Sequence, residues 1–365
     1  MGVDSWVYWL RFRTADFQKG DIETMKYRRM GRTGLKVSEL SLGTMTFGTH
    51  TDTEEADRML NLSFDAGINF IDTADAYGGG QSEEMLGKLL GPRREDAILA
   101  TKFFNPMGAG INDSGMSRVR ILKAIDASLK RLKTDYIDLY YIHHVDTQTP
   151  LEEMLEALND LVRSGKVRYI ACSNYEAWRL MESLWISDSR RWARFECYQP
   201  QYNLLTRDIE EELVPLCQYK GLGVAVWSPL ANGILTGKYR GQDGAIQGTR
   251  SADKWVFNPQ FFAPNANEIV DVVLEIANEL SCSPAQVATR WVLDQPIVTS
   301  VIVGARNIEQ FRNNLGSCQI QLTPDQSERL ESVSRLPMRY PKSMEFNMHE
   351  RRDNAVEMPS LADET

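Results

Sequence analysis

Short apolar segments alternate with amphipathic segments along most of the chain. Eight of the apolar segments follow one another, at residues 40–45, 69–73, 97–103, 136–143, 167–173, 195–199, 222–227 and 299–304. Most of them do not alternate strictly between apolar and polar positions, which is typical of parallel strands that are covered on both faces. We therefore predict eight buried strands.

Between these segments, apolar positions recur every three or four residues, which is the period of a helix with one buried face. The predicted helices span residues 53–65, 82–90, 117–132, 151–163, 176–184, 209–219, 265–280 with 284–293, and 308–315. The first seven strands begin about 27–40 residues apart, so one strand and one helix form a unit. Eight such units predict an α/β protein with a (β/α)8 TIM barrel.

A doubly wound parallel sheet is the structural alternative. It usually has fewer strands and a glycine-rich phosphate loop after its first strand. No G-x-G-x-x-G sequence follows the first apolar segment, and Gly221 and Gly223 precede a strand instead of following one. Residues 233–238 are not a P-loop, because three residues separate the glycines where a P-loop has four. The sequence therefore favours the barrel.

Two further features lie outside this repeat. Residues 25–37, with Gly31 and Gly34, predict a β-hairpin before the first barrel strand. After the seventh strand, residues 237–262 are rich in glycine and aromatic side chains and predict a long loop. The expected fold is thus a (β/α)8 barrel with an N-terminal β-hairpin and a long loop after strand 7.

One domain is expected between two terminal segments. Residues 1–24 lack the repeat and are interpreted as an extension, either disordered or upstream sequence read from an early start codon. Their aromatic residues Trp6, Tyr8 and Trp9 leave a packing role open. After residue 336 the chain becomes polar and loses its periodicity. The predicted boundaries are therefore 1–24 for the extension, 25–336 for the barrel and 337–365 for a C-terminal tail.

Composition and charge argue against several classes of protein. The 365 residues are 42% hydrophobic and 25% charged, ordinary values for a globular protein with a large core. A net charge of −9 argues against a nucleic-acid partner, which requires a basic surface. No segment approaches the roughly 18 apolar residues that cross a bilayer, so no membrane partner is expected. Five cysteines without a C-x-x-C motif and four histidines without an i, i+4 pair predict reduced thiols in the cytoplasm and no metal site.

Ionisable side chains come at the ends of three neighbouring predicted strands. Asp72 lies near the end of the second apolar segment and Lys102 near the end of the third, while His143 and His144 come at the end of the fourth. The carboxyl ends of the strands form the rim where barrel enzymes carry their active sites. A buried ammonium is costly without a partner, so we expect Asp72 and Lys102 to pair. A lysine that extends to solvent and a carboxylate that caps a turn are the alternatives.

Tyr77 follows the second strand and is expected to lie beside this pair. A nearby positive charge favours the phenolate and lowers the pKa of a tyrosine from about 10 toward neutral pH. Such a tyrosine can protonate a carbonyl oxygen as a general acid, and a packing role is the alternative. His143 and His144 are adjacent on a strand and are expected to point to opposite faces. The pattern alone does not choose which of them enters the barrel mouth.

Nine short motifs at the predicted strand ends resemble the aldo-keto reductase superfamily. They occur in the order of that family between about residues 25 and 336: GTMTFG at 43–48, FIDTADAY at 70–77, ATK at 100–102, YIH at 141–143, ACSN at 171–174, YQ at 198–199, WSPL at 227–230, GKY at 237–239 and VGAR at 303–306. Each motif alone is weak, but nine in the correct order are highly specific. The resemblance is strongest to the bacterial and fungal branches and to the branch that resembles potassium-channel β subunits.

The resemblance implies a catalytic tetrad of Asp72, Tyr77, Lys102 and His143, and it selects the first of the two histidines. Tyr77 is implied as the proton donor, Lys102 and Asp72 as the groups that tune its pKa, and His143 as the group that orients the carbonyl. The resemblance also implies a nicotinamide cofactor, NADPH or NADP+ rather than NADH, that is bound without a Rossmann fold. This agrees with the missing glycine motif.

The resemblance further implies residues that contact the cofactor. They are Gly43, Thr44 and Met45 after the first strand; Ser173, Asn174 and Gln199 at the carboxamide, with Trp227 stacked on the nicotinamide; Ser228, Pro229, Leu230, Gly233 and Lys238 along the pyrophosphate, with Arg250 over it; and Gly304, Arg306, Gln310, Asn313 and Asn314 around the adenosine. Arg306 indicates a preference for NADPH, because an arginine binds a 2′-phosphate through charge-assisted hydrogen bonds and a helix that starts near Asn307 favours anions. Asn313 departs from the acidic residue that the family often has there, so the adenine contacts are less defined.

The substrate is implied only as an aldehyde or a ketone, with Phe47, Phe103 and Trp255 suggesting an apolar mouth. Three functions are compared. The first is an NADPH-dependent oxidoreductase that reduces a carbonyl to an alcohol by hydride transfer. The second is a cofactor-binding regulatory subunit like the channel β subunits, which carry asparagine where this chain has His143. The third is a Schiff-base lyase with Lys102 as nucleophile. The complete tetrad favours the first, and the oligomeric state stays open.

Overall fold

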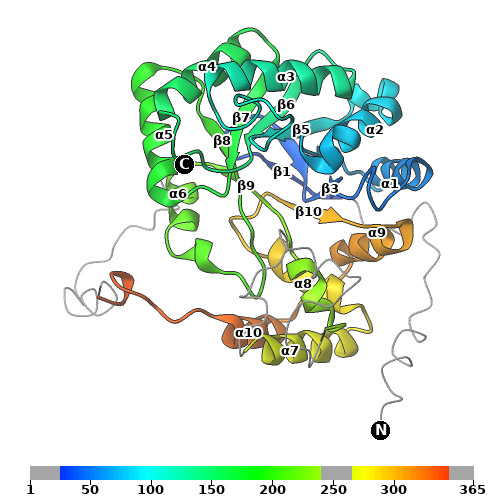
Figure 1. Cartoon of the computed structure of the whole chain (residues 1–365). Helices are drawn as coiled ribbons and strands as arrows, with labels where there is room; N and C mark the ends of the chain where they lie inside the picture. The colour runs from blue at the N-terminus through cyan, green and yellow to red at the C-terminus, as the bar shows by residue number, and fades with distance from the viewer. Residues whose placement is uncertain (1–24, 240–264, 345–365) are drawn as a thin grey trace. The chain divides into compact units, whose positions relative to one another are not determined.

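Eight parallel strands of the described chain close into a barrel (Figure 1). The computed structural model describes residues 25–239 and 265–344. The strands are β3 (Leu40–Gly43), β4 (Phe70–Asp72), β5 (Ile98–Phe103), β6 (Ile137–Ile142), β7 (Val167–Ser173), β8 (Phe195–Gln199), β9 (Gly223–Val226) and β10 (Ser300–Gly304). They pair in chain order, and β10 closes the barrel against β3. The predicted barrel is confirmed, and each strand lies inside its predicted segment.

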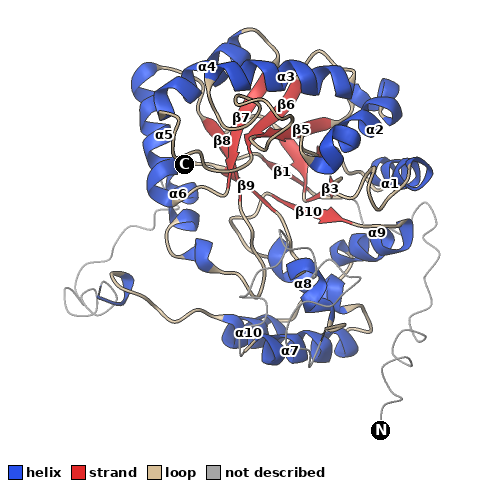
Figure 2. Cartoon of the chain, in the orientation of Figure 1, coloured by secondary structure: helices blue, strands red, loops and turns tan. Residues whose placement is uncertain are grey.

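Helices surround the strands of the barrel (Figure 2). The helices are α1 (Thr53–Asp65), α2 (Gln81–Leu89), α3 (Arg118–Leu132), α4 (Leu151–Arg163), α5 (Ala177–Arg190), α6 (Leu213–Lys220), α7 (Ala266–Glu279), α8 (Pro284–Leu293), α9 (Ile308–Leu315) and α10 (Pro324–Ser334). Capping residues fix several of their starts; for example, the side chain of Asp52 accepts the backbone N–H of Glu55 at the start of α1.

Three helices differ from the prediction. Helix α5 continues to Arg190, beyond the predicted end at residue 184. Helix α6 begins at Leu213, because residues Asp208–Glu210 form a separate 3-10 turn. Helix α10 was not predicted, although the sequence holds its start signal. Thr323 and Gln326 form a reciprocal cap there, in which each side chain accepts the backbone N–H of the other residue.

Side chains of the strands form two apolar layers, one inside the barrel and one between the barrel and the helices. Successive side chains of a strand point to opposite faces. Phe70 on β4, Ala100 on β5 and Tyr141 on β6 therefore lie in the inner cluster, whereas their neighbours Leu99 and Tyr140 lie in the outer one. This alternation decides which side chains at the strand ends reach the barrel mouth.

The predicted N-terminal hairpin is confirmed and closes one end of the barrel. Its strands β1 (Tyr27–Arg29) and β2 (Lys36–Ser38) pair antiparallel. Met30, in the turn between them, is fully buried in the inner cluster. A Cβ on Gly223, the first residue of β9, would lie 2.3 Å from the sulfur of Met30, so glycine is required there. The hairpin thus covers the amino ends of the strands, and the carboxyl ends form the opposite rim.

The chain divides into two units, residues 1–334 and residues 335–365. The second unit is described only as far as residue 344. The predicted extension at 1–24, most of the loop predicted over 237–262 and the rest of the tail lie outside the described residues. Among the helices that are described, none is long and apolar enough to cross a membrane.

Candidate active site

Two charged side chains lie inside the barrel mouth. Asp72 is the last residue of β4, and Lys102 is the next to last residue of β5. Each lies two residues after a member of the inner cluster, Phe70 and Ala100, so both point into the barrel. Their side chains are only 3% and 1% exposed, and such burial of two charges requires close pairing.

The ammonium of Lys102 makes three short contacts. Its Nζ lies 2.5 Å from Oδ1 of Asp72, 2.8 Å from the carbonyl oxygen of Thr73 and 3.2 Å from the hydroxyl oxygen of Tyr77. An ammonium has three N–H donors, and these contacts use all of them. Burial alone would lower the pKa of Lys102, but the Asp72 carboxylate and Tyr77 raise it above its ordinary value. Lys102 is therefore a fixed positive charge beside the hydroxyl of Tyr77.

Tyr77 reaches this pair from a turn that consists largely of glycine. Residues Tyr77–Gly80 form a short 3-10 turn, in which the three glycines have φ values of 58°, 64° and 101°. This left-handed backbone is accessible to glycine at little steric cost. The half-buried ring of Tyr77 lies with its centroid 4.9 Å from Nζ of Lys102. The turn thus directs the phenol toward the buried cation.

His143 follows the last residue of β6 and completes the predicted tetrad in space. Its ring lies edge to face with the ring of Tyr77, with centroids 5.8 Å apart. Burial, and then the nearby charge of Lys102, hold the pKa of His143 well below its usual value, so the imidazole is neutral at neutral pH. The side-chain nitrogen of Asn105 lies 3.4 Å from Nδ1 of His143, a contact that sequence reasoning missed.

The two adjacent histidines do not point to opposite faces, so this expectation is wrong. The rings of His143 and His144 stack with centroids 4.6 Å apart and planes 8° apart. The physical reason is that β6 ends at Ile142, and the alternation of side chains ends with the strand. His144 is exposed and also meets the ring of Phe104 edge to face, at 5.5 Å. The rings of His143 and His144 therefore both lie at the barrel mouth.

The three side chains that the resemblance assigns to a carboxamide are tied into the tetrad. Nε2 of Gln199 donates to Oδ2 of Asp72 at 2.8 Å. The hydroxyl of Ser173 donates to the carbonyl of Gln199, and Nδ2 of Asn174 donates to the carbonyl of His143. Sequence reasoning missed these links. Gln199 lies two residues after Cys197 of the inner cluster, so its side chain points into the barrel. This spacing was the available signal for its contact with Asp72.

The segment after β9 makes an irregular turn at the rim. Ser228, Ala231, Asn232 and Gly233 have positive φ values of 58°, 48°, 57° and 93°. The carbonyl of Ser228 accepts the side chain of Asn203 at 2.9 Å, which anchors this turn to the segment after β8. The resemblance also assigns Trp227, Pro229 and Leu230 in this turn to the cofactor. Trp227 and Leu230 are half-buried, and Pro229 is buried.

Lys238 is an exposed cation beside this turn. A Cβ on Gly233 would lie 2.9 Å from both Cε and Nζ of Lys238, so glycine lets the ammonium approach the backbone. The indole Nε1 of Trp227 is buried and has no hydrogen-bond partner among the described residues. Arg250, which the resemblance places over this region, lies outside the described residues.

The segment after β10 presents Arg306 at the start of α9. The backbone N–H of Arg306 donates to Oε1 of Gln310, and the N-cap Asn307 accepts the N–H of Gln310. Nδ2 of Asn314 approaches the carbonyl of the exposed Gly304 at 3.4 Å. The side chains of Gln310 and Asn314 thus shape this segment themselves. Asn313 is half-buried, and its carbonyl accepts the side chain of a residue on α8.

Two residues expected at the substrate mouth lie in the core instead. Phe103 and Phe47 are both fully buried, and Phe103 stacks on Tyr140 with ring centroids 4.8 Å apart. For Phe103, strand alternation explains this correction, because Lys102 points inward and its neighbour Phe103 must then point toward the helices. Phe47 follows β3 and packs into the apolar layer between the barrel and the helices. Trp255 lies outside the described residues.

The loop after β3 supports the site from below. Gly43 ends β3, and the hydroxyl of Thr44 donates to the carbonyl of Asp72 at 3.0 Å. Thr44 is fully buried and also contacts the hydroxyl of Ser82 on α2, at 2.8 Å. The side chain of Thr44 therefore joins β4 to α2, while Met45 is half-buried.

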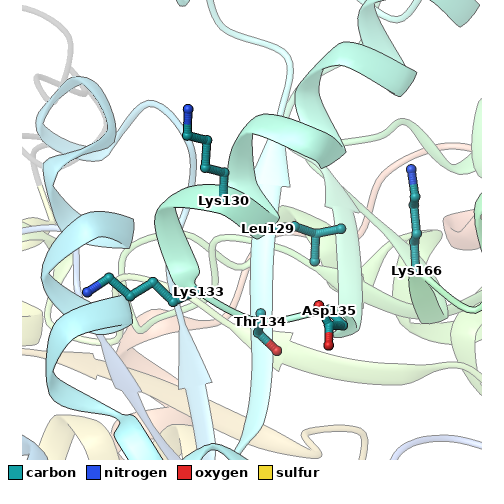
Figure 3. A pocket seen from close by; sticks show the side chains of 6 residues that line it. All are labelled: Leu129, Lys130, Lys133, Thr134, Asp135 and Lys166. Atoms are coloured by element: carbon teal, nitrogen blue, oxygen red, sulfur yellow. The ribbon is translucent and has the colours of Figure 1, made fainter.

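A shallow hollow lies elsewhere on the surface (Figure 3). It is lined by Leu129, Lys130, Lys133, Thr134, Asp135 and Lys166. These residues come from the end of α3 and from the segments that lead into β6 and β7, so the hollow lies at the amino ends of the strands. Lys166 is paired with Asp126 at 2.6 Å. The hollow is therefore separate from the tetrad.

A closed parallel barrel that gathers ionisable side chains at the carboxyl ends of neighbouring strands defines a barrel enzyme by its fold and the place of its site.

A model of the Aldo/keto reductase family matches residues 39–335. The chain is 38% identical over 320 residues to an uncharacterized oxidoreductase, YrpG, of Bacillus subtilis (strain 168), a match that spans 85% of this chain and 96% of the relative. It is 38% identical over 323 residues to a probable voltage-gated potassium channel subunit beta of Oryza sativa subsp. japonica, with shares of 85% and 96%. It is 34% identical over 333 residues to versiconal hemiacetal acetate reductase of Aspergillus parasiticus, with shares of 84% and 96%. The chain belongs to the Aldo/keto reductase family, and these matches support an oxidoreductase.

Proposed function

We propose that this protein reduces an aldehyde or a ketone to an alcohol, with NADPH as hydride donor and Tyr77 as general acid. The ammonium of Lys102 carries the proposal, because it donates to Asp72 and to Tyr77 inside the barrel mouth. A fixed cation beside a phenol favours the phenolate and lowers the pKa of Tyr77. The hydroxyl proton can then pass to a carbonyl oxygen near neutral pH.

Each member of the tetrad has one role in this proposal. Tyr77 gives its proton to the carbonyl oxygen, and Lys102 stabilises the phenolate that remains. Asp72 balances the charge of Lys102 and holds its ammonium in place. His143 is neutral because its pKa is lowered, and it holds the carbonyl oxygen through a ring N–H. NADPH, when bound, supplies the hydride to the carbonyl carbon.

The chemistry of the residues after β9 and β10 fits a dinucleotide with an extra phosphate. Trp227 offers a half-exposed indole ring for stacking, and Lys238 and Arg306 offer two positive charges. The N-terminus of α9, which begins at Ile308, favours an anion next to Arg306. We assign the 2′-phosphate to Arg306, because a guanidinium matches phosphate geometry with two parallel hydrogen bonds.

Two other functions receive less support. A Schiff-base lyase needs a neutral lysine as nucleophile, but the pKa of Lys102 is raised and its three N–H groups are all engaged. A cofactor-binding regulatory subunit is suggested by the relative that is named as a channel subunit beta. Such a subunit needs no proton donor, whereas His143 and Lys102 here both adjoin Tyr77.

The proposal is tested with a panel of carbonyl compounds that includes sugars, aromatic aldehydes, pyridoxal and methylglyoxal. We expect at least one class to be reduced, as measured by the loss of NADPH absorbance. Tyr77→Phe should lower kcat by about 10³-fold and leave NADPH binding, measured by tryptophan fluorescence, intact. Binding of NADPH without turnover of any compound would favour the regulatory subunit. Normal turnover by Tyr77→Phe would remove Tyr77 from the mechanism.

The cofactor assignment has its own variant. Arg306→Ala should weaken NADPH binding by about 10- to 100-fold, since a hydrogen bond to a charged group contributes about 1.5–3 kcal/mol. Binding of NADH should stay close to its original value. Equal losses for the two cofactors would exclude Arg306 from the phosphate site.

A further inference from the structure

A second group of charges, mostly buried, lies on the other side of the strand wall from the tetrad. It consists of Asp75 and Glu83 with Arg120 and Arg131, and we call it the outer charge cluster. Glu83 lies on α2 and both arginines on α3, two helices that are neighbours on the outside of the barrel (Figure 1). Asp75 lies in the segment that joins Asp72 to Tyr77, so this cluster reaches the chain that carries the proposed acid.

Arg120 contacts two segments of the rim with one nitrogen. Its Nη2 lies 2.8 Å from Oδ2 of Asp75 and 3.3 Å from the carbonyl oxygen of Asn105. The side chains of Arg120 and Asp75 are 3% and 1% exposed. Asn105 in turn approaches Nδ1 of His143. A single guanidinium therefore joins the segment before Tyr77 to the segment that contacts His143.

Arg131 fixes the other end of the same segment. It follows Arg120 by eleven residues, about three helical turns, so both arginines lie on one face of α3. Its Nε donates to Oε2 of the fully buried Glu83 at 2.7 Å. A Cβ on Gly80 would lie 3.0 Å from Cδ of Arg131, so the arginine packs directly over the glycine turn. Helix α3 thus holds the chain on both sides of Tyr77.

The glycine turn explains why such support is needed. Gly78, Gly79 and Gly80 gain much backbone freedom when they are not held, because glycine has no side chain to restrict it. The contact between Tyr77 and Lys102, at 3.2 Å, is also the longest of the three contacts of that ammonium. The local sequence therefore leaves the position of the phenol to its surroundings.

Stability alone does not account for the pair of Asp75 and Arg120. A buried ion pair is often replaced by apolar residues of similar size without loss of stability. In the described part of the chain, Oδ1 of Asp75 and Nε of Arg120 are also buried without a hydrogen-bond partner, which adds a cost. Burial raises the pKa of Asp75 to about 7, although Arg120 lowers it. The ionised carboxylate is therefore energetically unfavourable at this position.

We propose that Arg120 and Asp75 are positioning residues with two effects. They hold Tyr77 beside Lys102, and they hold Asn105 against His143. This inference rests on the proposed function, in which Tyr77 donates the proton. It predicts that loss of the pair lets Tyr77 move away from the ammonium, which makes its phenolate less stable and its proton transfer slower.

The test replaces both partners at once, as Asp75→Leu with Arg120→Met, because an apolar pair avoids an unpaired buried charge. Ionisation of Tyr77 is followed by the ultraviolet difference spectrum of tyrosinate, with Tyr77→Phe as the reference that identifies its signal. We expect the ionisation to shift to higher pH and kcat to fall by about 10- to 100-fold, the usual effect of a small misplacement. The KM for the carbonyl and the affinity for NADPH should change by less than about twofold, since both sites remain formed.

Arg118→Met is the matched control, because Arg118 lies on the same helix and pairs with Asp160 at the surface, at 2.5 Å. It should leave both readouts unchanged. Arg120→Lys keeps the charge but not the planar fork, and it decides the question if the double variant does not fold. A folded double variant, or failing that Arg120→Lys, with the original Tyr77 ionisation and kcat would overturn the inference. The ionisation needs no turnover, so it still tests the positioning if no carbonyl is reduced and the proposed function fails.

Discussion

Two buried groups of charges lie on the two faces of the same strand wall, and they are built differently. The inner one, which we call the inner charge cluster, consists of Asp72, Lys102, Tyr77 and Gln199. Every N–H of its ammonium has an acceptor, and both oxygens of Asp72 accept a hydrogen bond. The outer charge cluster instead leaves Oδ1 of Asp75 and a guanidinium nitrogen without partners in the described chain.

The two clusters also differ in how their charge depends on pH: the charge of Lys102 is fixed near neutral pH, whereas the charge of Asp75 varies. The inner charge cluster keeps Lys102 protonated beside Tyr77, because its pKa is raised. In the outer charge cluster, the pKa of Asp75 is raised to about 7, so its charge changes near neutral pH. One short segment supplies both groups, since Asp72 points into the barrel and Asp75 points toward α3. One face of this segment therefore carries a residue of the proposed proton transfer, and the other face carries a residue that positions the segment.

Among the variants that test the contrast between the inner and the outer charge cluster, Lys102→Met is expected to have the largest effect. It removes the cation that favours the phenolate, so we expect kcat to fall by about 10³-fold and the ionisation of Tyr77 to return toward its ordinary pKa of about 10. Steady-state reduction at saturating NADPH and the tyrosinate difference spectrum measure the two effects. A variant that folds and retains more than about a tenth of the original kcat would show that the inner charge cluster is not the source of the acidity.

Asp75→Asn tests the outer charge cluster through pH. The pKa of Asp75 is raised from 3.8 to about 7, first because burial disfavours the carboxylate. The folded protein then holds this proton more tightly than the unfolded chain, so the stability that it contributes is complete below about pH 3.8 and is lost as pH rises toward 7. Relative to Asp75→Asn, the free energy of unfolding of the original protein should fall by about 1.4 kcal/mol per pH unit in this window. Urea unfolding of both proteins across the window measures the difference.

His143 provides the control of opposite sign. Its pKa is well below the usual 6.5, so its contribution to stability is present above that pH and is lost as pH falls below it. His143→Asn should remove this loss on the acidic side and leave the effect of Asp75 in place. If the difference between the original protein and Asp75→Asn does not depend on pH, then Asp75 is charged throughout, and the contrast between the two clusters disappears.

Most of the barrel could be predicted because burial on two faces marks the strands directly. The apolar segments at 97–103 and 167–173, for example, coincide with β5 and β7 to within one residue. Helix α10 was missed because it carries a weak apolar face: of its three buried residues, only Leu330 is apolar, whereas Gln326 and Ser334 are polar. Pro324 and the cap at Thr323 were the stronger signal for it.

The site could be predicted only as far as the strand ends. Asp72, Lys102 and His143 occupy those ends, and their approach follows from the geometry of a parallel barrel. The links of Gln199 to Asp72 and of Arg120 to Asp75 join residues 127 and 45 positions apart, and no local pattern encodes such contacts. Phe103 is a different case, because the inward orientation of Lys102 already required it to point outward.

Phe103→Leu is the smallest of the expected changes and tests that last point. Phe103 belongs to the outer apolar layer and stacks on Tyr140, so the loss of part of its ring should cost about 1 kcal/mol of stability. The KM for a reduced carbonyl should not change, because the strand separates this ring from the barrel mouth. Urea unfolding and steady-state kinetics measure the two quantities on the same preparation.

Phe104→Leu is the matched control, since it changes the same side chain one position further along. Phe104 is half-buried and contacts the exposed ring of His144, which stands at the mouth beside His143. We expect this variant to change KM more than stability, the reverse of Phe103→Leu. If Phe103→Leu raises KM instead, the ring of Phe103 reaches the substrate during turnover, and the strand wall does not divide chemistry from support at this position.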